Sequence, residues 1–169
     1  MSTPEKKSPL NIIGSTEFVE VAGVKNIPAK IDTGADSSAI WASDIDMKED
    51  GTLIFSLFDK KSPLYTGERL KTNDYKARRV RSSNGTTQIR YRVVLPLKIG
   101  QKTFKAFFTL ANRSKNHFPI LIGRYALEEG NFLVDVRKTA VPRKIPHSPS
   151  KLDKELRENP YKFHKKYAK

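Results

Sequence analysis

The residues best suited to chemistry in this sequence are Asp32 and its two successors, Thr33 and Gly34. They directly follow a predicted strand in which apolar residues recur at every second position, namely Ile27, Ala29 and Ile31. A threonine hydroxyl can fix a tight loop by hydrogen bonding, and a glycine lets another backbone approach closely. The sequence therefore places one carboxylate where a strand leaves the core, on a loop that a substrate can reach.

A single carboxylate at this position does not complete the chemistry that the loop suggests. Aspartic-protease hydrolysis requires a water held between two carboxyl groups that share one proton, one acting as base and the other as acid. The remaining candidate carboxylates have no Thr-Gly or Ser-Gly after them: Asp44, Asp46, Asp59, Asp74 and Asp135. We therefore expect a homodimer, in which a second copy supplies its own Asp32 across a two-fold axis.

The tripeptide on its own is a weak signal. At average residue usage, Asp-Thr-Gly occurs by chance in about one chain in thirty of this size. Its structural alternative is an ordinary turn in which the side chain of Asp32 accepts backbone N–H groups. Further motifs are needed to choose between these two interpretations.

The pattern along the chain predicts an all-β fold, a small closed barrel with one short helix at 125–129. The predicted strands are 17–22, 27–31, 38–41, 52–58, 77–81, 86–97, 103–110, 119–122 and 132–136. Asn84-Gly85 between two of them predicts a hairpin, and 59–77 is expected to be a loop or insertion. We divide the chain into a flexible lead at 1–14, a domain at 15–136 and a basic, Pro-containing tail at 137–169. Within the tail, 151–158 is expected to form a short charged helix.

The chain is basic, with a net charge of +14. The tail contributes strongly, because 137–169 is rich in Lys and Arg and poor in Asp and Glu. Such a tail can contact a ribosome or another acidic surface. The alternative is a solvated extension, which we favour because the tail lacks aromatic platforms for single strands. No apolar stretch suits a secretory signal or a membrane span, so we expect a cytoplasmic protein with no membrane partner.

A second motif lies about ninety residues after Asp32, where an apolar strand runs through Gly123-Arg124 into a predicted helix. With the Asp32 loop and the hairpin in this order, the chain resembles the retropepsins, the dimeric retroviral-type aspartic proteases. It is most similar to a bacterial retropepsin-like group, often labelled ATP-dependent zinc protease and linked to the ribosomal-protein glutamate ligase system. The resemblance covers about 15–136 and rests on four further segments: 29–35, 80–85, 110–113 and 132–135.

The resemblance implies roles for the residues of the loop. Asp32 would be the catalytic carboxylate, Thr33 would brace the two loops of the dimer, and Gly34 would offer its backbone to the substrate. Ala35 and Asp36 would contact the substrate. Asp36 would also pair with Arg124, as a structural brace, a substrate-orienting pair or both; a partly buried pair would cost about 3–5 kcal/mol to break.

The hairpin falls where retropepsins carry a flap, so Ser83, Asn84 and Gly85 are expected to bind substrate. Its composition departs from the glycine-rich retroviral flap, because arginines flank the turn at positions 78, 79 and 81. A stiffer, basic flap would favour acidic substrates; the alternative is that this hairpin is not a flap. The insertion at 59–77 and the tail have no retroviral counterpart, which leaves dimerisation and substrate access open.

Metal and cofactor chemistry finds no support in the residues. The chain has no cysteine, and its three histidines, His117, His147 and His164, stand apart with no His-Glu-x-x-His pattern. A phosphate-binding Gly-x-x-x-x-Gly-Lys-Ser/Thr loop is also missing, so we expect neither metal nor cofactor. Two functions remain: an aspartic endopeptidase acting on peptides or proteins, and a non-catalytic retropepsin-fold module that binds a peptide or a ribosome-associated partner.

Overall fold

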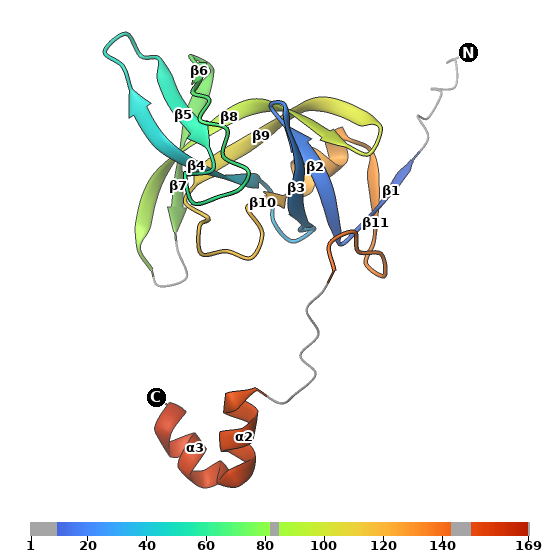
Figure 1. The fold of residues 1–169 in the computed structure, drawn as a ribbon, viewed down its shortest axis with the longest axis vertical. Helices are drawn as coiled ribbons and strands as arrows, with labels where there is room; N and C mark the ends of the chain where they lie inside the picture. Colours follow the sequence, from blue (N-terminus) through green and yellow to red (C-terminus); the bar gives the residue numbers. More distant parts are fainter. Residues whose placement is uncertain (1–9, 82–84, 143–149, 169) are drawn as a thin grey trace, which may run out of the picture.

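The computed structural model describes residues 10–81, 85–142 and 150–168, and in them it places eleven strands and three helices (Figure 1). The strands are β1 (Asn11–Gly14), β2 (Thr16–Val21), β3 (Val24–Ile31), β4 (Ser38–Met47), β5 (Leu53–Leu57), β6 (Leu70–Thr72), β7 (Tyr75–Arg81), β8 (Thr87–Ile99), β9 (Lys102–Ala111), β10 (Ile120–Ile122) and β11 (Phe132–Asp135). The helices are α1 (Arg124–Glu129), α2 (Lys151–Glu158) and α3 (Pro160–Tyr167).

Six strands close into a barrel, in the order β10-β3-β2-β8-β9-β4, and the pairing of β4 with β10 completes the ring. Strands β5 and β6 extend the sheet beyond β4, and β7 pairs with β8 outside the ring. The predicted fold class, a small closed barrel with a short helix near the end of the domain, is confirmed. The predicted hairpin is present as β7 and β8, which pair from Tyr75 with Val93 to Arg81 with Thr87.

Alternation of apolar residues builds the core, as the sequence indicated. On β8 the inward positions are Val93, Leu95, Leu97 and Ile99, all at most 7% exposed. Strand β9 pairs antiparallel with β8 and contributes its own buried set, Ala106, Phe108 and Leu110. Each large side chain buried in this way contributes about 1.5–3 kcal/mol, so the β8–β9 ribbon is a main source of stability.

The domain extends beyond the predicted bounds at both ends. Four residues of the expected flexible lead form β1, which pairs in parallel with β11. Beyond 136, the chain returns to β2, where the Ser15 N–H donates to the carbonyl of Lys138 (2.8 Å) and the Ala140 N–H donates to that of Thr16 (3.1 Å). Both segments therefore pair with residues of the predicted domain, and the long-range pairing was not revealed by local patterns.

The segment 59–77 is more ordered than a plain loop. It contains β6 and the first residues of β7, and β6 continues the sheet at the edge of β5. A three-residue strand is too short to give a periodic signal in the sequence.

The tail carries the predicted helix at 151–158 and a second helix that the sequence analysis missed. Ser150 and Asp153 form a capping box for α2, while the side chain of Asn159 caps α3 ahead of Pro160. Glu155 then joins the two helices by accepting hydrogen bonds from Lys166 Nζ (2.6 Å) and from the hydroxyl of Tyr167 (3.0 Å). Among the described residues, no helix is both long and apolar enough to cross a membrane.

Two neighbouring phenylalanines on β9 test this account of the core. Phe108 is 0% exposed and Phe107 is 47% exposed. Phe108→Ala is expected to lower the free energy of unfolding by about 3–5 kcal/mol, because it leaves a cavity in the barrel. Phe107→Ala, the matched control, is expected to cost about 1 kcal/mol. Urea unfolding measures both, and equal losses would contradict the assignment of the two faces.

Candidate active site

Asp32 lies at the end of β3, on a loop that joins two strands on either side of β10. Strand β10 pairs in parallel with β3 and antiparallel with β4, so the loop 32–37 crosses the end of β10 (Figure 1). The backbone N–H of Asp32 donates to the carbonyl of Ile122, the last residue of β10, at 2.9 Å. Two strands of the barrel therefore fix the position of this carboxylate.

The loop folds back on the Asp32 side chain. The N–H of Gly34 donates to Asp32 Oδ1 at 3.0 Å, and the N–H of Ala35 donates to the Asp32 carbonyl at 3.3 Å. The Asp32 side chain is half-buried, while Thr33 and Gly34 are exposed. The turn that the sequence offered as a structural alternative is thus present, and it presents the carboxylate at the surface rather than hiding it.

The Gly-Arg motif holds the other side of this loop. The N–H of Gly123 donates to the hydroxyl of Ser38 at 3.1 Å, and the N–H of Arg124 donates to the carbonyl of Ala35 at 2.8 Å. A Cβ atom on Gly123 would lie 2.7 Å from the backbone of Ser37 and 2.9 Å from the Ala35 carbonyl oxygen. Only glycine fits here, which explains why an apolar strand must end in Gly123 to position the Asp32 loop.

Ser38 is a residue that the sequence analysis did not single out. It is 2% exposed, and its hydroxyl accepts the N–H of Gly123. In the sequence, Ser38 is a hydroxyl residue at the start of an apolar strand. This pattern is common, and it does not indicate that the hydroxyl bonds to Gly123, 85 residues later.

Asp36 and Arg124 form the predicted ion pair, with Arg124 Nη2 donating to Asp36 Oδ1. The hydrogen bond and the charge of Asp36 raise the pKa of Arg124 above its usual value. The expectation that this pair is partly buried is wrong, because the side chains are 53% and 56% exposed. Water screens such a pair, so its loss should cost no more than that of a surface ion pair.

The hairpin of β7 and β8 is strongly cationic. Its register places Lys76 opposite Arg92 and Arg78 opposite Arg90, and like charges directly opposite one another destabilise a sheet. Of the expected substrate-binding residues here, Ser83 and Asn84 lie outside the described residues, and Gly85 is exposed with a φ of +82°. The structure thus gives the hairpin, and its action as a flap remains a prediction.

The structure brings the loop residues Asp32, Thr33, Gly34, Ala35 and Asp36 together with Arg124 in one unit, built from β3, β10 and the start of α1. Gly85 belongs to a separate element, the turn before β8. Within the described ranges, no three His, Cys, Asp or Glu side chains cluster as a metal site would require. The chemistry this unit offers is that of the half-buried Asp32 carboxylate, which reaches the surface on a hydrogen-bonded loop and, unlike Asp36, is not paired with Arg124.

Comparisons with known proteins agree with this geometry. Residues 12–144 match the family model of the retropepsin-like aspartic endopeptidase RimB. Relatives named probable alpha-L-glutamate ligase, from Desulfotalea psychrophila and Shewanella pealeana, are each 31% identical over 121 residues. The match covers 69% of this chain but 26% of each relative, so the chain spans about a quarter of their length.

A solved structure resembles this fold. The crystal structure of Lpg0085, a protein of unknown function from Legionella pneumophila, superposes with a TM-score of 0.61 at 27% sequence identity. The match covers 76% of this chain and 95% of the Legionella protein. The shared fold therefore accounts for almost all of the Legionella chain.

The exposure of the Asp36–Arg124 pair leads to a test. We expect Arg124→Gln to lower the thermal midpoint no more than Lys48→Gln, which breaks the similarly exposed pair of Lys48 with Asp46. Differential scanning calorimetry of the two variants makes the comparison. A much larger loss for Arg124→Gln would show that this residue braces the fold through its side chain.

Proposed function

Because this chain belongs to the RimB-like family of retropepsin-like aspartic endopeptidases, we propose that it hydrolyses peptide bonds with a water held between two Asp32 carboxylates, one from each of two copies. The observation that carries the proposal is the position of Asp32 on a surface loop fixed by both β10 and the start of α1. A carboxylate held this firmly at the surface is preorganised for chemistry.

The reaction follows from the pairing of the two carboxyl groups. Their closeness prevents both from ionising, so they share one proton. The ionised Asp32 takes a proton from the water as it attacks the peptide carbonyl carbon, and the protonated Asp32 donates its proton to the carbonyl oxygen. In the second step the C–N bond breaks as the Asp32 that took the water's proton passes it to the leaving nitrogen. One hydroxyl of the tetrahedral intermediate returns its proton to the other Asp32 as the new carboxyl group forms, so the pair again shares one proton.

A dimer needs a surface that a second copy can cover. The two-stranded sheet of β1 and β11 has an apolar outer face, in which Ile12 pairs with Leu133 and neighbours Leu10. These side chains are 58%, 49% and 58% exposed, respectively. A pair of strands with an open apolar face is marginal by itself, which supports its burial against a second copy.

The substrate that we propose is a peptide or protein segment with acidic side chains. The two faces of the β7–β8 hairpin carry Arg79 and Arg81 on one side and Lys76, Arg78, Arg90 and Arg92 on the other. An acidic segment would relieve the repulsion between these cations. The ligase activity in the names of the relatives is not transferred, because a quarter-length match does not identify the part that carries it.

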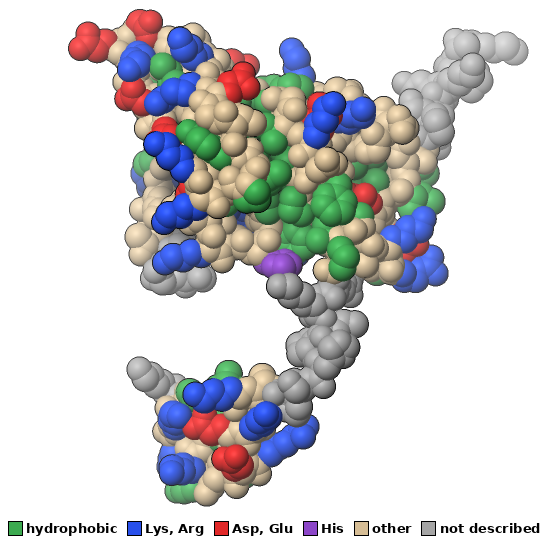
Figure 2. All heavy atoms as spheres, in the orientation of Figure 1, with side chains coloured by type: hydrophobic (Ala, Val, Ile, Leu, Met, Phe, Trp, Pro, Cys, Tyr) green, Lys and Arg blue, Asp and Glu red, His purple; other side chains and the backbone are tan. Residues whose placement is uncertain are grey.

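A binding module without catalysis is the second proposal, and the tail favours it. The helices α2 and α3 present many Lys and Arg side chains (Figure 2), and they also expose Tyr161 and Tyr167, with Lys165 Nζ 5.5 Å from the ring of Tyr161. Aromatic rings beside cations suit a nucleic-acid partner such as ribosomal RNA. The sequence analysis overlooked these rings when it described the tail as lacking aromatic platforms.

Replacing the carboxylate of Asp32 tests the proposed hydrolysis. Asp32→Asn keeps the shape of the side chain but cannot share a proton, so cleavage of a peptide library is expected to fall at least about a thousandfold. Asp46→Asn is the control, since Asp46 is an exposed carboxylate near the end of β4 that is remote from the loop.

Mass spectrometry of the digests, with pepstatin as a second probe, gives the readout. Cleavage that persists in Asp32→Asn would overturn the aspartic mechanism. A wild-type protein that cleaves nothing and stays monomeric at high concentration would favour the binding module.

A further inference from the structure

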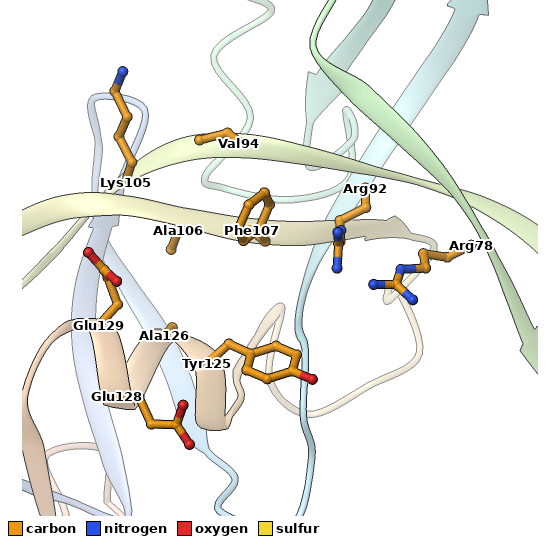
Figure 3. A pocket seen from close by; sticks show the side chains of 10 residues that line it. All are labelled: Arg78, Arg92, Val94, Lys105, Ala106, Phe107, Tyr125, Ala126, Glu128 and Glu129. Carbon is orange, nitrogen blue, oxygen red and sulfur yellow. The ribbon is translucent and has the colours of Figure 1, made fainter.

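A groove separate from the Asp32 loop lies between the outer face of the β8–β9 ribbon and helix α1 (Figure 3). Its volume is about 760 Å³, within the range of ligand-binding pockets. The ribbon contributes one wall and α1 the other, and β7 adds Arg78 at one end.

The end of the groove nearest the hairpin is cationic. Arg78 and Arg92 both extend into it, and the hydroxyl end of Tyr125 points toward the same space (Figure 3). The guanidinium of Arg92 lies over the ring of Phe107, with its central carbon 4.7 Å from the ring centroid. Among the described residues, neither arginine has a carboxylate within ion-pair distance.

One nitrogen atom of Arg92 is shielded from water and makes no hydrogen bond with the described residues. Arg92 Nε is buried and has no hydrogen-bond partner in the described part of the chain. A buried donor of this kind costs free energy unless an acceptor reaches it. The register adds repulsion, because Lys76 lies opposite Arg92 and Arg90 opposite Arg78. The repulsion, together with two arginines that have no carboxylate partner among the described residues, favours a bound anion at this end.

The rest of the groove differs in character. Its apolar floor includes Val94, Ala106, Phe107 and Ala126, and Phe107 is 47% exposed although it is a large aromatic residue. At the far end, the lining includes Glu128 and Glu129 of α1, whereas the ammonium group of Lys105 points away from α1 (Figure 3). A ligand that fills the groove therefore meets cations, then an apolar surface, and then carboxylates.

We propose that this groove binds the free C-terminus of a peptide whose last residue is apolar or aromatic. The terminal carboxylate lies between Arg78 and Arg92, where the terminal nitrogens of the two guanidinium groups donate to its two oxygens. The last side chain packs on Phe107 and Tyr125. A basic residue upstream reaches the acidic end at Glu128 and Glu129.

A carboxylate fits this groove better than a phosphate does. A phosphate monoester carries nearly two negative charges, and the two glutamates of the same groove would repel it more strongly than a single charge. A C-terminus also places its carboxylate directly beside an apolar side chain, which is the order in which the groove presents its cations and its floor.

The site does not depend on the proposed protease activity, although it touches the same elements. Arg78 and Arg92 belong to the hairpin, and Tyr125 donates its backbone N–H to the carbonyl of Asp36 at 3.1 Å. A ligand in the groove would therefore bridge the hairpin and the helix next to the Asp32 loop. Binding can be measured with Asp32 replaced, which separates this inference from catalysis.

The experiment titrates the full-length Asp32→Asn chain with the peptide acetyl-Lys-Ala-Phe as the free acid and as the C-terminal amide. Amide-proton chemical shifts follow binding and report the residues involved. We expect the free acid to shift resonances of β8, β9 and α1 and to bind at least about tenfold more tightly than the amide. Inorganic phosphate and phenyl phosphate are titrated in parallel.

Three variants locate the carboxylate. Arg92→Gln and Arg78→Gln are each expected to weaken binding of the acid about tenfold and to leave binding of the amide unchanged. Arg90→Gln is the matched control, because it removes the same charge from the same hairpin but does not line the groove. The thermal midpoint of each variant checks that it folds.

Several results would overturn the proposal. Equal affinity for acid and amide, or no binding of either, would exclude a C-terminus as the ligand. An equal loss in Arg90→Gln would reduce the effect to the general charge of the hairpin. Tighter binding of phenyl phosphate than of the peptide acid would assign the groove to phosphate.

Discussion

The arrangement of the whole site depends on the close approach of Gly123 to the backbone of Ala35 and Ser37. A Cβ atom at Gly123 would lie within 3 Å of that backbone, so the chain has no room for any other residue there. This contact allows β10 to end between β3 and β4. It also allows the N–H of Gly123 to donate to the hydroxyl of Ser38 and the N–H of Arg124 to donate to the carbonyl of Ala35. The position of Asp32 follows from backbone packing rather than from the Asp36–Arg124 ion pair, which lies in water.

Much of this could be predicted from the sequence, because the signals are local. The apolar residues at alternate positions predicted β3, and Asn84-Gly85 predicted the hairpin. The Gly123-Arg124 motif, read through a family resemblance, predicted which helix meets the Asp32 loop. The exposure of the ion pair could not be predicted, because burial depends on what packs around a pair and not on the residues that form it.

The missed elements share a physical cause. Strand β1 exists because it pairs with β11, more than a hundred residues later, and β6 is three residues long. Helix α3 begins with Pro160 after its cap at Asn159, a start signal that the sequence analysis did not consider. These elements are determined by a pairing partner elsewhere in the chain or by a capping residue. The apolar periodicity of a short sequence window therefore gives little information about them.

Charge has a different role from packing in this molecule. The barrel needs no cations on its hairpin, and the pairs of like charge across β7 and β8 destabilise that ribbon. Their retention makes sense if anionic groups bind there, both in the groove beside α1 and on substrate. The central claim, however, is that Asp32 acts only together with the Asp32 of a second copy.

Mixing active and inactive chains tests that claim most directly. Wild-type and Asp32→Asn chains are combined at a fixed total concentration, allowed to exchange, and assayed for peptide cleavage. If each site needs both carboxylates, an equal mixture retains about a quarter of the wild-type activity, because only wild-type pairs are active. Activity that falls to about half, in direct proportion to the wild-type chains, would show that each chain works alone and would contradict the account.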